Sequence, residues 1–250
     1  MQGKVRIIQL AVVGGLLLAW ELSSRTGFVD ARLLPSPSVV VPTALALLGE
    51  PGFQRHLFTT IWQVLTAIAI ATPLGALIGV VLAESPYLGR AFQPFFNFIA
   101  AVPKSVFLPV FILLFGTGFD QKVAFGVFQA IFVIVITTGA AVTAVPSDLL
   151  RLARAYGASR WQTWSEVHWH AMLPVLLEGL RLGMIFNITG VIFAEMYVAR
   201  LGLGQRLATW GQSFQMPELY AGILIAAALS IAVNESLRLV ERRVGVWRTA

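Results

Sequence analysis

The sequence predicts an all-α protein that crosses a membrane six times, on the basis of its composition and of six long apolar stretches. Of its 250 residues, 57% are hydrophobic and only 12% are charged, whereas an ordinary soluble domain has roughly 25% charged residues. The mean hydropathy of +0.79 agrees with this imbalance. Charged side chains are too few to cover a hydrophobic core, so a soluble globular enzyme is excluded. The high hydrophobicity also excludes a disordered chain.

The six apolar stretches are membrane spans within one domain that extends over residues 1–250. A span needs about 20 apolar residues to cross ~30 Å of hydrocarbon. We expect the spans at about residues 5–22, 56–83, 95–115, 123–145, 173–198 and 219–240. Pro103 and Pro109 interrupt the third span. The alternative for the first stretch is a cleaved signal peptide, which we disfavour because no small-x-small cleavage pattern follows it.

Arginine and lysine positions favour an orientation with both termini in the cytoplasm, because positive residues collect in the cytoplasmic segments of membrane proteins. With that orientation the inside holds Lys4, Arg6, Arg90, Arg151, Arg154, Arg160, Arg238, Arg242, Arg243 and Arg248. The outside holds a smaller set, Arg25, Arg32, Arg55, Lys122, Arg200 and Arg206. The net charge of +6 is not concentrated in a basic cluster, so we expect no nucleic-acid partner.

Two further local patterns bear on the fold. In the long outer connection from residue 23 to 55, the prolines of Leu34-Pro35-Ser36-Pro37-Ser38 fix an extended path before a short amphipathic stretch over residues 39–48. In the second span, Gly75 and Gly79 form a GxxxG pattern, which lets helices approach closely. We favour packing within the chain over a seam between two copies.

The inner connection from residue 146 to 170 predicts two short helices that meet at Gly157. Ser147 or Asp148 can cap the first helix. Apolar residues recur at helical spacing from residue 149 to 156, and Gly157 then stands where a glycine ends a helix in a left-handed turn. Ser159 and Gln162 form a capping box, which begins a second helix. A plain amphipathic pair at the membrane surface is, from physics alone, an equally good interpretation.

This connection resembles the "EAA" segment of the membrane subunits of bacterial ABC importers, in the form found in nitrate/sulfonate/taurine-type permeases. The family pattern is Glu-Ala-Ala, three residues, Gly, nine residues, Ile, one residue and Leu-Pro. Ala153, Gly157 and Val167 take the last alanine, the glycine and the isoleucine. The departures are Arg151 for Glu, Leu152 for the middle Ala, and Trp169-His170 for Leu-Pro, although a Leu-Pro follows at residues 173–174.

The resemblance extends along nearly the whole chain. Residues 153–163 (ARAYGASRWQT) are close to the form seen in this permease group. The other similar motifs, in order, are Leu34-Pro35-Ser36-Pro37-Ser38, Val102-Pro103-Lys104, Leu108-Pro109, Phe115-Gly116-Thr117-Gly118, Ala194-Glu195-Met196, Gly202-Leu203-Gly204 and residues 239–247. Several independent motifs in the right order make the resemblance specific.

The resemblance implies the type I permease fold of ABC importers, with residues 146–170 as a cytoplasmic coupling-helix pair. It also implies alternating access driven by a partner, in the bacterial cytoplasmic (inner) membrane. The implied partners are an ABC ATP-binding subunit, a periplasmic or lipid-anchored solute-binding protein, a second permease copy (most simply a homodimer) and membrane lipid. The residues implied to couple the chain to the ATPase are Arg151, Ala153, Arg154, Ala155, Tyr156, Gly157, Ala158, Ser159 and Trp161.

The chain itself has no P-loop, so we expect ATP and Mg to be bound, and ATP hydrolysed, in a separate subunit. Of Lys4, Lys104 and Lys122, only Lys104 is followed by Ser or Thr, and Pro103 rather than glycine precedes it. No cofactor and no metal site are expected in this chain, because cysteine is absent and His168 and His170 are only two residues apart. No arrangement of catalytic residues stands out, so we do not expect an enzyme.

Two charged residues within the spans are candidates for the translocation pathway. Lys104 follows a helix-breaking proline, and an intramembrane charge marks a functional site by default. A cation beside a pathway suits an anionic substrate, but a lysine that snorkels to the interface is the alternative. Glu195 could line an outer gate, or it could fix a neighbouring helix by hydrogen bonding, which the resemblance favours.

Two other function classes fit the sequence less well. An ion-gradient-driven secondary transporter or a channel would show inverted repeats or several intramembrane acids, and a membrane-embedded enzyme would show clustered catalytic residues. Neither signature is evident. The substrate stays open, because relatives carry sulfonates, taurine and nitrate as well as neutral or cationic heterocycles. A small anion such as a sulfonate or nitrate is one expectation.

Overall fold

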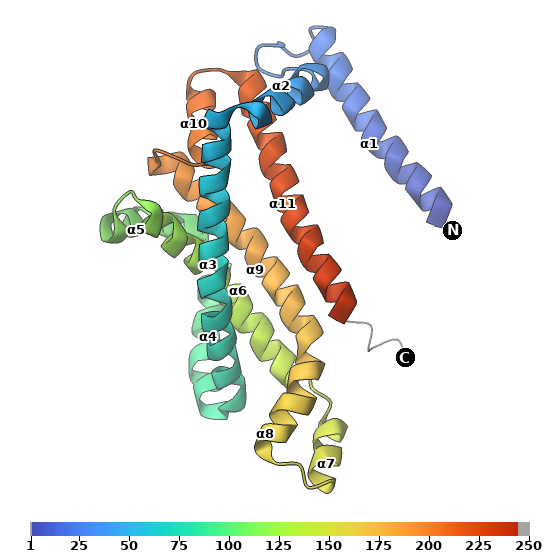
Figure 1. The fold of residues 1–250 in the computed structure, drawn as a ribbon, viewed down its shortest axis with the longest axis vertical. Helices are drawn as coiled ribbons and strands as arrows, with labels where there is room; N and C mark the ends of the chain where they lie inside the picture. The colour runs from blue at the N-terminus through green and yellow to red at the C-terminus, as the bar shows by residue number, and fades with distance from the viewer. Residues whose placement is uncertain (1, 245–250) are drawn as a thin grey trace.

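The computed structural model describes residues 2–244, and all the regular structure in that range is helical (Figure 1). Five helices are long and apolar enough to cross a bilayer, and a bent helix pair makes a sixth crossing if it is counted as one span. The five are α1 (Gln2–Arg25), α3 (Pro51–Glu84), α6 (Phe119–Thr143), α9 (Trp169–Val198) with the helical residues just before it, and α11 (Met216–Val244). The prediction of an all-α membrane fold is confirmed. The end of the predicted tail motif, from residue 245, and Arg248 lie outside the described residues.

The bent pair replaces the single interrupted span that the sequence predicted over residues 95–115. It consists of α4 (Pro86–Ala101), followed by η1 (Lys104–Phe107) and α5 (Leu108–Phe115), with a bend of 92° between them. Val102 is extended (φ −72°, ψ 139°), because a following proline disfavours the helical conformation. Pro103 has no N–H to continue the helix. The break therefore lies at a proline visible in the sequence, while its angle is a property of the fold.

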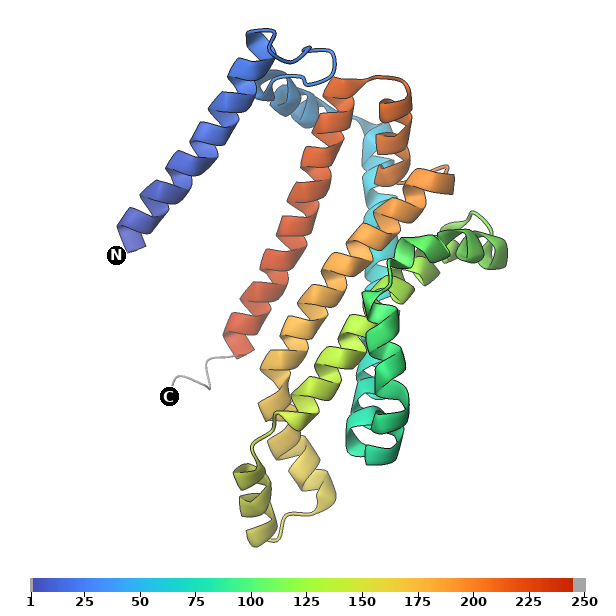
Figure 2. The same cartoon turned by 180° about the vertical axis from the view of Figure 1, so that it is seen from behind.

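Three helices, α3, α6 and α9, pack against one another and form the centre of the structure (Figure 2). Glycines allow the close approach. A Cβ atom at Gly75 would lie 2.8 Å from Cγ2 of Ile134, and one at Gly79 would lie 2.7 Å from the carbonyl oxygen of Val135. Both glycines of the GxxxG pattern therefore pack on α6 of the same chain, as we expected.

The first helix stands apart from the other helices (Figure 1), and none of its membrane span is buried. Its C-terminal end is held in place by Trp20 and Glu21. The indole N–H of Trp20 donates to the carbonyl oxygen of Pro35 at 3.1 Å, and its ring lies 6.1 Å from that of Tyr220. The Glu21 carboxylate accepts from the hydroxyl of Ser38 at 2.7 Å. These contacts join α1 to the start of α2 (Pro37–Gly49).

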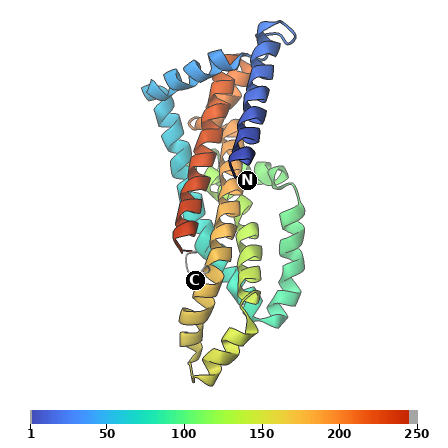
Figure 3. The same cartoon turned by 90° about the vertical axis from the view of Figure 1, so that its right-hand side faces the viewer.

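The inner connection forms one end of the elongated molecule (Figures 1 and 3), and we call residues 147–168 the elbow tip. It comprises α7 (Ser147–Ala155), α8 (Arg160–Gln162) and the π-helical turn η2 (Thr163–His168). Gly157 has φ 75°, and Ser159 and Gln162 form the predicted capping box. Two expectations are wrong. The N-cap of α7 is Pro146, with no side-chain cap bond. The second helix is not short, because α8 and η2 continue into α9 as one helix over Arg160–Val198.

The opposite end is built from α2, α10 (Leu203–Gln212) and the start of α11. The stretch expected at residues 39–48 lies within α2, but it is apolar and not amphipathic, because Val39, Val41, Leu45 and Leu48 are exposed while Val40, Ala44 and Leu47 are buried. The helix α10 was not expected. Its Leu203, Leu207 and Trp210 pack in one apolar cluster with Val40 of α2 and Ile225 of α11. This cluster joins segments that lie far apart in the sequence.

Candidate functional site

The elbow tip presents a surface that is both apolar and cationic. Tyr156 is 84% exposed and Trp161 is 80% exposed. Arg151 lies 3.9 Å from Asp148, but both side chains are exposed, so this ion pair contributes little to stability. Exposed aromatic rings that are flanked by arginines are typical of protein–protein interfaces. The surface can therefore bind another protein, whereas it holds no group arranged for catalysis.

The geometry of the tip depends on Gly157. The N–H of Gly157 donates to the carbonyl oxygen of Arg154, and the N–H of Ala158 donates to that of Ala153, both at 3.0 Å. These two bonds make a Schellman motif, which requires a residue with positive φ and favours glycine there. A Cβ at Gly157 would meet no atom within 4 Å. Glycine is thus required by the backbone conformation and not by lack of space.

A buried polar cluster lies toward the opposite end of α9, and we call it the Glu195 cluster. It comprises His56, Thr60, Lys122, Glu195 and the turn of residues 202–204. The Glu195 carboxylate, which is fully buried, accepts from the hydroxyl of Thr60 at 2.8 Å and from the N–H of Gly204 at 2.8 Å. The same hydroxyl accepts from the N–H of Leu203 at 2.7 Å. One carboxylate thereby joins α9, α3 and the first turn of α10.

The turn in this cluster needs glycine at two positions. Gly202 has φ 127°, and a Cβ there would collide with the Glu195 carboxylate. A Cβ at Gly204 would collide with the carbonyl oxygen of Ile192. Nδ1 of His56 lies 3.1 Å from the amide nitrogen of Gly202 and 3.0 Å from its carbonyl oxygen. The turn is therefore held on both sides, by α9 and by α3.

Lys122 is the cation of the Glu195 cluster. The sequence analysis assigned it to an outer loop, but it lies in α6 and is 1% exposed. Its Nζ donates to the carbonyl oxygen of Thr117 at 2.6 Å and interacts electrostatically with Glu195. Because both side chains are buried, the opposite charges of Lys122 and Glu195 offset part of the free energy that each charge loses on leaving water.

Lys104 lies apart from the cluster, at the 92° bend. It is 6% exposed. Its Nζ donates to the carbonyl oxygen of Ala100 at 3.2 Å and lies 5.3 Å from the centre of the Phe186 ring on α9. The lysine therefore caps the end of α4 and contacts α9. In this conformation neither Lys104 nor Glu195 faces open space.

The histidines that the sequence analysis considered as metal ligands bond to nearby backbone. Nδ1 of His168 lies 3.3 Å from the carbonyl oxygen of Thr163, and its ring stacks on Trp164. Nδ1 of His170 lies 3.1 Å from the carbonyl oxygen of Glu166. Within residues 2–244, no three His, Asp or Glu side chains gather in a way that could hold a metal ion.

Comparison with known families identifies the chain. A family model described as "Binding-protein-dependent transport system inner membrane component" matches residues 71–246, more than half of the sequence. The chain belongs to this family. The chain is therefore a multi-pass permease subunit of a binding-protein-dependent ABC importer, as the resemblance predicted. An ion-gradient-driven transporter or a channel is not favoured.

Individual relatives agree with the family. The taurine transport system permease protein TauC of Escherichia coli is 26% identical over 246 residues, which cover 96% of this chain and 89% of TauC. The putative aliphatic sulfonates transport permease protein SsuC of Bacillus subtilis is 27% identical over 235 residues, with coverages of 94% and 85%. The riboflavin transport system permease protein RibX of Chloroflexus aurantiacus is also 27% identical over 235 residues, with coverages of 94% and 88%.

The fold has a counterpart among solved structures. An inward-facing structure of the MetNI methionine ABC transporter superposes with a TM-score of 0.68 over 76% of this chain and 94% of that chain. The sequence identity is 18%, so this likeness concerns the fold alone.

Several residues of the permease's Glu195 cluster escaped the sequence analysis. His56 and Thr60 of the cluster, and Gln63 outside it, are all buried and lie on one face of α3, at the i, i+4, i+7 spacing. This spacing of polar residues on one face of an apolar span is the sequence pattern that could have indicated a buried polar site. Lys122 gave no such signal, because a lysine near a span end ordinarily lies in water.

We predict that Glu195→Ala destabilises the purified permease by about 1–3 kcal/mol, because it leaves the buried Thr60 hydroxyl and Gly204 N–H without an acceptor and removes the negative charge that partly offsets the buried charge of Lys122. Thermal unfolding in detergent measures the change. Glu84→Ala, at an exposed position of α3, is the control and should melt as the wild type does. A double variant, Glu195→Gln with Lys122→Met, should melt above Glu195→Ala. Equal melting of wild type and Glu195→Ala would contradict the role of this cluster.

Proposed function

We propose that two copies of this chain form a pathway for a small organic anion, such as a sulfonate, and that a separate ATP-binding subunit docks on the elbow tip and drives import. The observation that carries the proposal is the exposed surface of the tip, with Tyr156, Trp161 and Arg151 around the Gly157 turn. Exposed patches of this kind mark interaction sites. The partner supplies the ATP and Mg site, since this chain has no GxxxxGK[ST] sequence.

The continuity of α9 supplies a route from the tip to the far side. The helix over Arg160–Val198 has 39 residues, which is about 58 Å at 1.5 Å per residue. Its first turns belong to the elbow tip, and Glu195 lies near its other end. When paired ATPases close, a displacement of the tip moves α9 and, with it, the Glu195 cluster. Rocking of this one rigid helix then opens the pathway alternately to the two sides of the membrane.

The names of TauC and SsuC support a sulfonate as the substrate class, and Lys104 supports an anion. Among the described residues its Nζ donates one hydrogen bond, to the carbonyl oxygen of Ala100, whereas an ammonium group has three donors. The bend beside Pro103 also breaks the helical backbone, which is tolerated within a membrane where it lines a cavity. Lys104 is thus placed to bind an anionic group when the bend opens.

The first test concerns the coupling role of the tip. Gly157→Val imposes a strain of about 1–2 kcal/mol on a left-handed backbone, so the α7 turn should open and the docking surface should lose its shape. We expect normal membrane insertion, but loss of substrate-stimulated ATPase activity in the reconstituted complex and weaker pull-down of the ATPase. Gly27→Val is a matched control, because Gly27 has φ 77°, no atom within 4 Å of its Cβ position and a location far from the tip. Full activity and pull-down in Gly157→Val would refute the coupling role.

The second test concerns Lys104. Lys104→Ala should lower the uptake of a labelled sulfonate at least tenfold, while Lys104→Arg, which keeps the positive charge, should retain most of it. Both variants should be compared at equal amounts of assembled complex. Uptake by Lys104→Ala at the wild-type rate would remove this lysine from the pathway and leave a purely structural role.

The third test concerns orientation. We propose that both termini and the elbow tip lie in the cytoplasm, because arginines concentrate on that side. The chain has no cysteine, so single cysteines can be labelled cleanly. In intact cells or spheroplasts, Ser213→Cys should react with an impermeant thiol reagent, and Ser159→Cys should react only after lysis; both positions are exposed. The reverse pattern would invert the topology.

A further inference from the structure

Phe214 adopts a backbone conformation that L residues rarely occupy. Its φ is 55°, and it is the one non-glycine residue with positive φ among residues 2–244. Its N–H donates to the carbonyl oxygen of Gly211, and the N–H of Gln215 donates to that of Trp210 at 2.9 Å. These are the two bonds of a Schellman motif, the same motif in which Gly157 ends α7. The turn itself therefore favours glycine and does not require phenylalanine.

The ring of Phe214 does not serve the core. It is 73% exposed, whereas the apolar contacts beneath α10 come from Leu203, Leu207 and Trp210. The adjacent residues Ser213 and Gln215 are polar and exposed. The ring thus stands among polar neighbours, just before the span-forming helix α11 begins at Met216. Strained residues of this kind cluster at functional sites.

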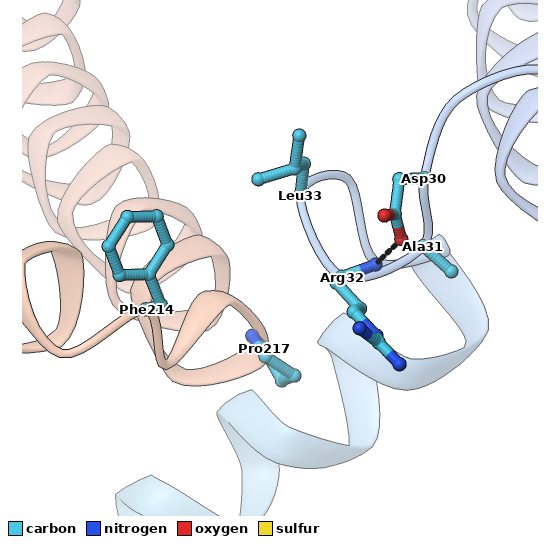
Figure 4. A pocket seen from close by; sticks show the side chains of 6 residues that line it. All are labelled: Asp30, Ala31, Arg32, Leu33, Phe214 and Pro217. Carbon is cyan, nitrogen blue, oxygen red and sulfur yellow. Dashed lines mark hydrogen bonds between the residues drawn. The ribbon is translucent and has the colours of Figure 1, made fainter.

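Phe214 forms one wall of an open pocket of about 550 Å³ (Figure 4), which we call the Phe214 notch. The lining residues are Asp30, Ala31, Arg32, Leu33, Phe214 and Pro217. Phe214 comes from the α10–α11 turn and Pro217 from the first turn of α11, and the others come from the loop between α1 and α2. The Asp30 carboxylate accepts from the backbone N–H of Arg32 at 2.8 Å, while no described side chain forms an ion pair with the Arg32 guanidinium. Leu33 is 54% exposed.

We propose that the Phe214 notch is a docking point for the solute-binding protein, and that it receives a protrusion that carries an acidic side chain beside an apolar one. This inference rests on the proposed function. The α1–α2 loop and the α10–α11 connection, which carry the notch residues, lie at the end of the molecule opposite the elbow tip (Figure 1), and in the proposed topology this end faces the compartment from which the binding protein delivers solute. Aromatic rings and arginine are the residues enriched at interface cores. The unpaired guanidinium sets the preference for an acidic partner residue, and Phe214, Leu33 and Pro217 set the preference for an apolar one.

The notch is connected mechanically to the Glu195 cluster. The helix α10 begins at Leu203, whose N–H is bonded to Thr60, and ends at the turn that carries Phe214. A partner that engages the ring therefore acts through one short helix on α3 and α9. A docked binding protein, acting through α10, and the ATPase, acting through α9, therefore both shift the conformation of the Glu195 cluster.

The experiment measures how much ligand-loaded binding protein is needed for half-maximal stimulation of ATPase activity in the reconstituted complex. Phe214→Gly should raise that concentration about tenfold or more, as expected for an interface anchor. It should also leave the melting temperature unchanged or higher, since glycine suits the turn. Arg32→Glu should have a similar effect on stimulation. Arg55→Glu, at an exposed arginine at the start of α3, is the charge-matched control and should change little.

The outcomes separate the two proposals. If Phe214→Gly requires the same concentration of binding protein as the wild type, the ring does not contact the binding protein and the notch is not a docking point. If Arg32→Glu and Arg55→Glu weaken stimulation equally, the attraction is a general property of the surface, and the notch is again overturned. If Phe214→Gly melts well below the wild type, the ring is structural. If the wild-type complex itself shows no dependence on a binding protein, the proposed function fails.

Discussion

The hydrogen bonding of the buried Glu195 carboxylate is the interaction on which the half of this permease opposite the elbow tip depends. Inside a membrane protein no water replaces a missing partner, so every buried polar group must find one within the protein. Glu195 has the Thr60 hydroxyl and the Gly204 N–H, and Lys122 lies within electrostatic reach. Because these groups come from α3, α6, α9 and the start of α10, satisfying one carboxylate fixes four elements. The glycines at 202 and 204 are needed because any side chain there would occupy the space that the carboxylate and α9 take.

Other features of the fold connect the Glu195 cluster to the elbow tip at the opposite end of the molecule. The centre is rigid because glycines bring α3, α6 and α9 into direct contact, as with Gly75 and Gly79 against α6. The helix that contains Glu195 continues unbroken into the elbow tip. The 92° bend at residues 102–103, by contrast, is a break that Lys104 pins to α4 and α9. A rigid helix and a helix break that is held in place both suit a transporter with two states, because packed cores switch between discrete arrangements and do not deform continuously.

The two Schellman turns show how the same local geometry can serve different ends. At Gly157 the residue is the one that the turn prefers, and the shape of the tip results from it. At Phe214 the same turn carries a ring that the fold does not use. The first turn lies on the surface that we assign to the ATPase, and the second on the surface that we assign to the binding protein. The likeness to MetNI at 18% identity indicates that the fold itself tolerates wide sequence change.

Several features of this protein can be predicted from the amino-acid sequence alone. Apolar runs predict spans, Gly157 and the Ser159–Gln162 box predict the elbow, Pro103 predicts a break, and the order of motifs predicts the family. The elbow and the break rest on backbone chemistry within about four residues, whereas the spans rest on runs of about 20 apolar residues and the family on motifs spread along the chain. Four features are seen only in the folded structure: the 92° angle, the helix α10, the continuity of α8 with α9, and the burial of Lys122. The bond between Thr60 and Glu195 joins residues 135 positions apart. No local pattern specifies such a pair, because it forms only when the packing of α3, α6 and α9 has brought the two side chains together.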